Sequence, residues 1–389
     1  MQEHPLFSNC RAILADLVSF PVLGGASNVT IAQYIGKHLE EHGIDFHYVP
    51  NEAGDKMALH CRIGPAVDGG VILSGHTDVV PTEGQAWDTD PFKLVNKDKR
   101  LYGRGTTDMK GFIACCIAAL PRMKEVTLKK PIYFAFSYDE EIGCLSGPII
   151  ARAIRDHYKE KPAMAIIGEP TSMRLANAEK GMGVFETTIY SRAGHSSQIR
   201  SGASAIQEAA KLMIWLEDKM GSLIATGQID DRFSPPHSTM QAGICQGGLA
   251  PNIIADHCHI QWDLRIIPAD NWQAILDDFL QYCKGRETHC QKSVPEFRIE
   301  TIPQYPFVPS LDTHLTSNAV QFAQHLVNHD ELATVAFASE AGQFAEVGFE
   351  AVLCGPGHVT ECHIANEFVE IEQLQECLVF MDKLVQQLS

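Results

Sequence analysis

Hydrophobic side chains recur along the first part of the chain at spacings that predict alternating helices and strands. Residues 28–42 have apolar positions at helical spacing, with Asn28 as the expected cap and Gly43 as the end. The segment 111–120 is apolar all round, which is typical of a helix inside a core. Short apolar runs predict buried strands at 57–63, 71–73, 131–136 and 163–167. This alternation indicates an α/β fold.

The pattern changes between residues 183 and 302. Strands are predicted at 183–191, 237–245, 252–266 and 296–301, and helices at about 203–220 and 269–284. The order β-α-β-β-α-β is that of a ferredoxin-like unit. The α/β pattern then returns and ends in a long amphipathic helix. We therefore expect a discontinuous domain, residues 1–182 and 303–389, with a mixed sheet flanked by helices, and a ferredoxin-like domain inserted at 183–302.

Length, charge and cysteine usage narrow the class of protein. A chain of 389 residues exceeds the usual size of one hydrophobic core, which agrees with two domains. The net charge of −17, with no basic run, argues against nucleic acid or an anionic membrane as a partner. No long apolar span and no signal peptide are recognisable, so we expect a cytoplasmic protein. The 12 cysteines include no C-x-x-C pair and are expected to be buried thiols.

Histidines and carboxylates occur beside glycine or proline turns, most of them at the ends of the apolar runs. The candidates are His76, Asp78, Asp108, Glu140, Glu141, Glu169 and His363. Imidazole and carboxylate ligands suit zinc, cobalt or manganese. A pair of such metals activates water and stabilises the tetrahedral intermediate of amide hydrolysis. The set therefore predicts a two-metal hydrolytic site.

Most of these residues also have a simpler interpretation when taken singly. A His-x-Asp segment such as 76–78 is more often a capped turn than a metal site. Asp108, just before an apolar helix, resembles an ordinary helix cap. Glu140 and Glu141 resemble a solvated acidic turn. Only their occurrence together, in this order, favours the metal site.

The motifs resemble those of a zinc-dependent exopeptidase and deacylase family. That family includes acetylornithine deacetylases, succinyl-diaminopimelate desuccinylases, aminoacylases and glutamate carboxypeptidases. The resemblance covers essentially the whole chain, and within the family it is strongest to the acetylornithine deacetylases. The motifs that carry it are Gly103-Arg104-Gly105, Asp108-Met109-Lys110-Gly111, Glu140-Glu141-Ile142-Gly143-Cys144, Gly168-Glu169-Pro170-Thr171 and Gly355-Pro356-Gly357.

The resemblance implies two divalent metal ions, zinc or alternatively cobalt, bridged by Asp108. His76 and Glu169 would hold one ion. Glu141 and His363 would hold the other. These assignments follow from matching each residue to its family motif.

The resemblance also implies roles for neighbouring residues. Glu140 would be the general base, and Asp78 would orient His76, since a metal-bound imidazole usually donates its other N–H to an oxygen. His358 competes with His363 for the late ligand position. His363-Ile364-Ala365-Asn366-Glu367 matches the family pattern, so the ligand is placed at His363.

Further residues are matched less specifically. By resemblance, His195 would steady the oxyanion in the active site of a partner subunit, which implies a homodimer formed through the inserted domain. Asn252 and Arg265 match positions that line the substrate carboxylate or the intermediate; a guanidinium suits a carboxylate. Glu340 could pair with a substrate ammonium, or it could be an exposed loop residue.

The implied reaction is removal of the acetyl group from N2-acetyl-L-ornithine, giving acetate and L-ornithine for arginine synthesis. The segment 363–367 follows the generic family form rather than the deacetylase form, which has Pro-Asp-Glu after the histidine. Succinyl-diaminopimelate desuccinylase and a broader N-acyl-L-amino acid deacylase therefore remain alternatives. A metal-free binding or scaffold protein is disfavoured by the intact ligand set.

Overall fold

The computed structural model describes residues 3–389, which form two compact units. Within the described residues, unit 1 consists of 3–179, Leu311–Val335 and Ser339–Ser389, and unit 2 of Lys180–Ser310 and Ala336–Ala338. The expected inserted segment, 183–302, lies wholly inside unit 2, which extends a few residues further on each side. Among the described residues, no helix is long and apolar enough to cross a membrane.

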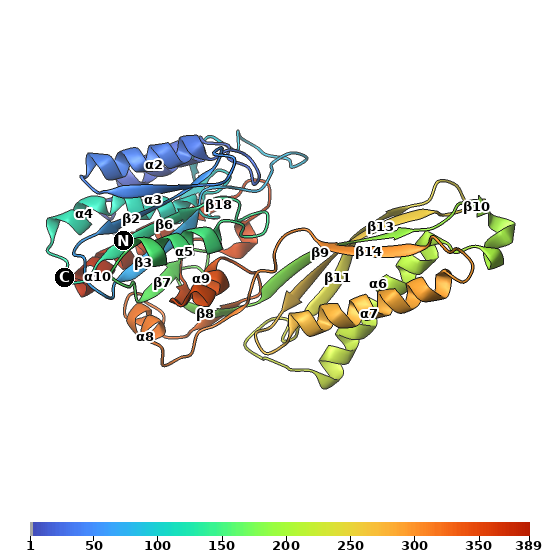
Figure 1. The fold of residues 1–389 in the computed structure, drawn as a ribbon. Coiled ribbons are helices and arrows are strands. Elements are labelled where there is room, and N and C mark those ends of the chain that lie inside the picture. Colours follow the sequence, from blue (N-terminus) through green and yellow to red (C-terminus); the bar gives the residue numbers. More distant parts are fainter. Residues whose placement is uncertain (1–2) are drawn as a thin grey trace. The chain divides into compact units, whose positions relative to one another are not determined.

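Unit 1 is built on a mixed sheet of nine strands (Figure 1). The strands are β1 (Phe46–Pro50), β2 (Met57–Ile63), β3 (Val71–His76), β6 (Ile132–Ser137), β7 (Met164–Ile167), β8 (Ala176–Glu179), β15 (Leu311–Asp312), β16 (Ala333–Val335) and β17 (Glu350–Leu353). Their order is β1-β2-β6-β3-β7-β17-β8-β15, and β16 pairs with β8. The central strands β6, β3, β7 and β17 are parallel, so their carboxyl ends meet at one edge.

Helices cover both faces of this sheet. They are α1 (Phe7–Val18), α2 (Val29–Glu41), α3 (Lys110–Ala118), α4 (Leu120–Glu125), α5 (Gly147–His157), α8 (Asn318–Gln324), α9 (Ala341–Val347) and α10 (Ile371–Gln387). Helix α3 packs on β3 and is surrounded by α1, α2, α4 and α10, which explains why it is apolar on every side. Helices α5 and α9 pack on one another and on β6 and β17. A smaller sheet, β18-β5-β4, joins Phe368–Glu370, Arg100–Tyr102 and Val95–Lys97.

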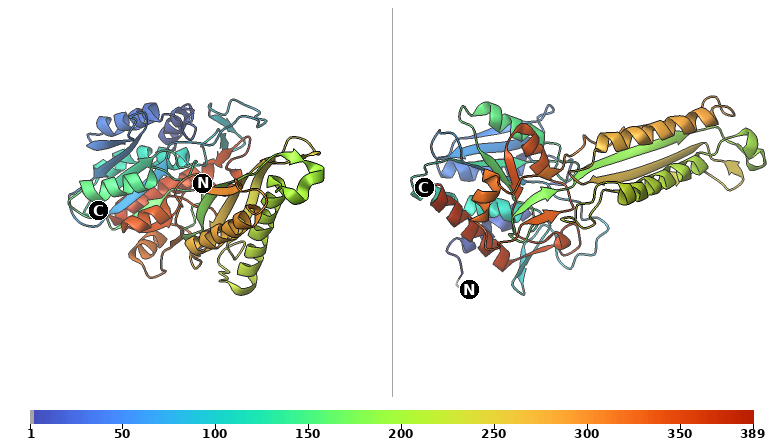
Figure 2. Two further views of the ribbon diagram at one scale, coloured as in Figure 1. Left: turned by 45° about the vertical axis from the view of Figure 1, so that its right-hand side comes forward. Right: turned by 90° about the horizontal axis from the view of Figure 1, so that it is seen from below.

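Unit 2 has the predicted ferredoxin-like order. Its elements are β9 (Gly181–Tyr190), α6 (Ala205–Thr226), β11 (Thr239–Gly247), β13 (His257–Ile266), α7 (Trp272–Cys290) and β14 (Arg298–Pro303). The antiparallel sheet has the order β11-β13-β9-β14, and Figure 2 shows α6 and α7 running along it. A separate two-stranded ribbon pairs β10 (Gly194–His195) with β12 (Ile253–Ile254). In the chain, β10 lies between β9 and α6, and β12 lies between β11 and β13. The predicted fold class is confirmed.

Asn28 stands at the N-cap position of α2, as predicted, but its side chain makes no capping hydrogen bond. Its amide instead accepts a hydrogen bond from the Met57 N–H and donates one to the Met57 carbonyl, both at 2.8 Å. Asn28 is therefore satisfied by the backbone of β2, a long-range partner that a local helix-start pattern does not reveal.

Candidate active site

Three neighbouring parallel strands of unit 1 bring candidate ligands to one edge of the sheet. His76 is the last residue of β3, which lies between β6 and β7. Glu140 and Glu141 follow β6, and Glu169 follows β7. The carboxyl ends of strands in an open α/β sheet are the usual place for a binding site.

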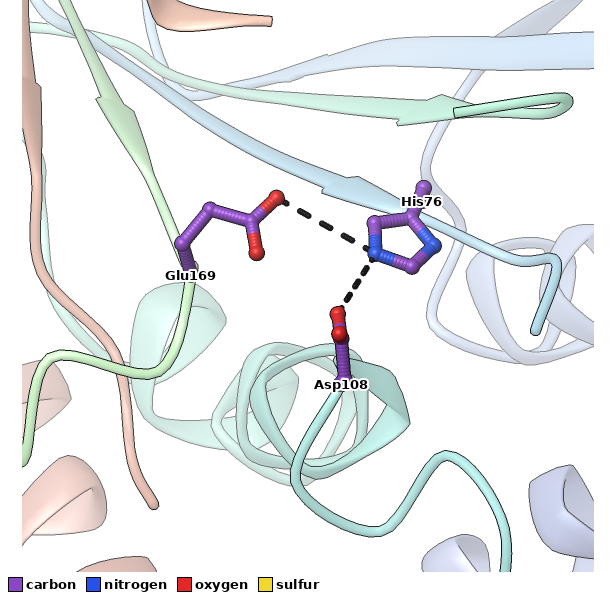
Figure 3. Close-up of side chains that lie close together, drawn as sticks. All are labelled: His76, Asp108 and Glu169. Carbon is purple, nitrogen blue, oxygen red and sulfur yellow. Dashed lines mark hydrogen bonds and ion pairs between the residues drawn. The ribbon is translucent and has the colours of Figure 1, made fainter. Parts of the chain in front are cut away.

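Asp108 reaches the same place from another element, the loop that precedes α3. Its Oδ1 is 3.0 Å from Nε2 of His76, and its Oδ2 is 3.2 Å from Nε2 of His363. Figure 3 shows the carboxylates of Asp108 and Glu169 directed at the His76 ring. A carboxylate with one oxygen directed at each imidazole is arranged to bridge two cations.

The potential ligand atoms form two groups that share Asp108. One group contains His76, Asp108 and Glu169, and the other contains Asp108, Glu141 and His363. Within each group the atoms lie within 4.8 Å of one another. In the second group, Glu141 Oε2 is 3.1 Å from His363 Nε2. The structure thus brings together all five side chains predicted as ligands, while their binding of metal stays a prediction.

Only one of the two late histidines lies at these carboxylates. The His358 side chain is 57% exposed and accepts a hydrogen bond from the Thr360 N–H, so it caps a short 3-10 turn, Val359–Glu361. His363 occupies a backbone position with φ of 63°, which turns its imidazole toward Asp108 and Glu141. The geometry supports the choice of His363.

Asp78 supports the site in a different way from the one expected. The group nearest His76 Nδ1 is the backbone carbonyl of Asp78, at 2.9 Å, while its carboxylate is 3.7 Å away. The carboxylate instead accepts the N–H groups of Glu140 and Glu141, at 3.2 and 3.1 Å. Buried N–H groups need acceptors, so the Asp78 carboxylate fixes the turn that carries both glutamates.

Glu140 lies beside the two ligand groups. Its Oε2 is 4.0 Å from His76 Nε2, and its Oε1 accepts a hydrogen bond from the Cys144 thiol at 3.2 Å. The preceding residue, Asp139, was not recognised as functional from the sequence. Asp139 pairs with Lys56 and accepts the Gly25 N–H at 2.8 Å, at a positive φ of 55°. It anchors the start of the acidic turn, and its position two residues after the end of β6 is the only sequence signal for this role.

The electrostatics show that this site has an excess of buried negative charge. Burial, reinforced by the Asp108 charge, raises the pKa of Glu141 to about 7 and that of Glu169 well above its usual range. The Asp108 and Glu141 carboxylates, which accept hydrogen bonds from the His363 imidazole, raise the pKa of His363 to about 10. Burial alone would lower the pKa of His76, but its hydrogen bond with Asp108 and the nearby carboxylates raise it well above normal. Additional positive charge would stabilise the ionised carboxylates.

The side chains present fit divalent cations. Glu169 Oε1 is buried and has no hydrogen-bond partner, although it lies only 4.0 Å from His76 Nε2. A cation held by the first group would satisfy this oxygen. Imidazole and carboxylate ligands suit zinc and cobalt, and neither group includes a thiol.

The predicted residues of unit 2 do not all lie together. His195 and Asn252 are exposed and adjacent, since β10 pairs with β12 and Ser196 N–H donates to the Asn252 carbonyl at 3.1 Å. His257, which follows β12 closely in the chain, is the first residue of β13. Arg265 lies near the opposite end of that strand and pairs with Asp263 at 2.9 Å. The eight-residue separation along the strand corresponds to about 26 Å.

Glu340 is not an exposed loop residue. It is 1% exposed, precedes α9, and packs beside Gly147. Burial raises its pKa to about 7, partly offset by the hydroxyl of Ser137. Its Oε1 has no hydrogen-bond partner. Its predicted contact with substrate stays a prediction.

Comparison with known proteins identifies the family. A model described as Peptidase family M20/M25/M40 matches residues 72–387. The chain belongs to this family. It is also 31% identical to an acetylornithine deacetylase of Myxococcus xanthus over 384 residues, which cover 96% of both chains. The resemblance inferred from the motifs is confirmed, and the protein is a metal-dependent amide hydrolase.

Solved structures share the fold at low identity. An M20 family metallo-carboxypeptidase, Sso-CP2 from Sulfolobus solfataricus, has a TM-score of 0.75 at 16% identity, over 97% of this chain and 98% of that one. The YXEP protein of Bacillus subtilis, described as a dinuclear metal binding peptidase, has a TM-score of 0.67 at 16% identity, over 98% of each chain. These similarities support the fold of the whole chain.

Proposed function

We propose that the protein is a dinuclear deacetylase that hydrolyses N2-acetyl-L-ornithine to acetate and L-ornithine, a step that would serve arginine synthesis. The observation that carries the dinuclear part is the position of Asp108, whose two oxygens are directed at His76 and His363. The substrate is inferred from the likeness to acetylornithine deacetylases over nearly the whole chain. Zinc is the proposed metal, with cobalt as a substitute, because the donors are nitrogen and oxygen.

The chain's own residues account for the movement of protons. When bound, the two cations would polarise the acyl carbonyl and acidify the attacking water. Glu140 accepts the proton of that water on its Oε2, since its Oε1 is engaged by Cys144. The oxygen of that water bonds to the acyl carbon, the amide C–N bond breaks, and Glu140 passes the proton to the leaving amine nitrogen, which gives the carboxylate and the free amine. Burial raises the pKa of Glu140 well above its usual range, which favours a residue that holds and releases a proton.

Unit 2 is proposed to form a homodimer and to supply His195 to the partner's active site. The support is that His195 lies on β10, which pairs with β12 just before the His257 end of β13, whereas Arg265 lies about 26 Å from His257 along that strand. A small acyl amino acid cannot contact both residues of one chain. If both act on one substrate molecule, one of them must come from a second copy. Two-fold symmetry would then complete both sites equally.

A broader N-acyl-L-amino acid deacylase is the second candidate. Glu340, the residue proposed to pair with the ornithine ammonium, is 1% exposed in this structure. A site without an accessible carboxylate for the ammonium would accept neutral side chains as readily. This observation favours a wider range of acyl amino acids.

Product release from three substrates distinguishes these functions. The enzyme is loaded with zinc, and kcat/KM is measured for acetylornithine, acetylmethionine and succinyl-diaminopimelate. A clear preference for acetylornithine supports the deacetylase. Equal values for the first two substrates support the broader deacylase, and a preference for the third supports a desuccinylase. If the enzyme hydrolyses none of the three substrates, the proposal is refuted.

A further inference from the structure

A buried ion pair joins the two loops that carry Asp108 and His363. Arg104 and Glu367 are 263 residues apart in the chain, yet their Nη1 and Oε2 atoms are 2.7 Å apart. Both side chains are only 1% exposed. Arg104 precedes Asp108 by four residues, and Glu367 follows His363 by four residues. Neither charged group belongs to the two ligand groups.

The second oxygen of Glu367 holds the backbone at Asp108. Glu367 Oε1 accepts the Thr107 N–H at 2.9 Å and the Asp108 N–H at 3.2 Å. The Glu367 carbonyl also accepts the Gly103 N–H at 2.9 Å. A residue of the His363 loop therefore fixes the position of the Asp108 backbone.

The guanidinium of Arg104 reaches His363 in turn through Gln85. Arg104 Nη2 donates to Gln85 Oε1 at 2.6 Å, and Gln85 Nε2 donates to the His363 carbonyl at 2.8 Å. His363 has a φ of 63°, a conformation that a non-glycine residue keeps only when its surroundings hold it there. These hydrogen bonds form a continuous chain from the Asp108 backbone through Glu367, Arg104 and Gln85 to the His363 backbone.

We infer that Arg104, Glu367 and Gln85 are positioning residues that set the spacing between Asp108 and His363. They thereby control the affinity of the metal position that these two residues share with Glu141. This inference rests on the proposed function, because it assumes that both groups bind metal. A buried ion pair contributes little to stability compared with apolar side chains of similar size. Its hydrogen bonds to the loops that carry Asp108 and His363 indicate that the pair instead holds these two loops in position.

The test is metal binding by variants that interrupt this chain of hydrogen bonds. Gln85→Ala removes a half-exposed side chain, so the variant is expected to fold, and it separates Arg104 from the His363 carbonyl. Arg104→Lys keeps the charge but loses the forked donors. Arg62→Lys is the matched control, because Arg62 also pairs with a largely buried glutamate, Glu160, near the start of β6. Metal content after dialysis and the two zinc dissociation constants are measured for each variant and the wild type.

In Gln85→Ala and Arg104→Lys we expect one of the two metals to bind about 10–100-fold more weakly, as is typical when a partner of a ligand is lost. The other metal should bind as in the wild type, excess metal should restore kcat, and Arg62→Lys should keep both metals. Wild-type affinity for both metals in both variants would overturn the inference, as would equal weakening of both metals. If Arg104→Lys does not fold, Gln85→Ala decides alone. A wild type that does not bind two metals would refute the proposed function itself, and the inference with it.

Discussion

The adjacent residues Glu140 and Glu141 allow a paired test, because the same substitution should have opposite consequences. Glu140→Gln keeps the size of the side chain and an oxygen that can accept from Cys144, but it cannot take a proton. Loss of a general base typically lowers kcat by about 10²–10⁴-fold. This corresponds to about 3–5 kcal/mol of transition-state stabilisation. Both metals should remain bound.

Glu141→Gln is the matched control. Glu141 Oε2 is 3.1 Å from His363 Nε2 and belongs to the second ligand group, so a neutral amide there should release at least one metal on dialysis. Acetate release gives kcat, and elemental analysis of the same samples gives metal content. Loss of metal from Glu140→Gln, or retention of both metals by Glu141→Gln, would show that the two roles are exchanged.

Other consequences can be measured separately. Asp108→Ala should lose most activity and at least one metal, and two tightly bound metals in that variant would rule out a bridge. Inactive His195→Ala, mixed with inactive Glu140→Ala, should regain up to about half the activity of a wild-type site pair by subunit exchange, unless His195 serves its own chain. If Glu340 binds the ornithine ammonium, Glu340→Gln should shift the preference for acetylornithine over acetylmethionine roughly tenfold, since charged hydrogen bonds contribute about 1.5–3 kcal/mol; equal effects on both substrates would leave Glu340 a structural role. Burial, together with neighbouring histidines, lowers the pKa of His60 to about 3. Below about pH 6.5 the unfolded chain therefore binds a proton at His60 that the folded protein does not, which lowers the free energy of unfolding by about 2 kcal/mol at pH 5. Urea unfolding of His60→Asn should show a smaller loss of stability between pH 7 and pH 5 than the wild type.

The sequence predicted the parts of the fold that depend on local periodicity. The strand at 57–63 matches β2, and the order of elements in unit 2 follows from the spacing of apolar positions. His76 and Glu169 were recognisable because they stand at the ends of buried strands. Such local patterns survive folding because the same side chains form the core.

Contacts between distant segments were not predictable in this way. The Arg104–Glu367 pair joins residues 263 positions apart, and nothing local marks either residue as a partner. Asn28 fits a helix cap by type, but a backbone partner in β2 takes its side chain. The sequence indicates Asp78 as a site residue but does not predict its partners. Its carboxylate lies closer to the backbone N–H groups of the turn that carries Glu140 and Glu141 than to His76.

The most direct test of the central claim is anomalous diffraction from crystals of the zinc-loaded protein. The account predicts two zinc peaks, one on each side of the Asp108 carboxylate. One peak should be coordinated by His76 and Glu169, and the other by Glu141 and His363. A single peak at full zinc loading, or a pair of peaks that Asp108 does not bridge, would contradict it.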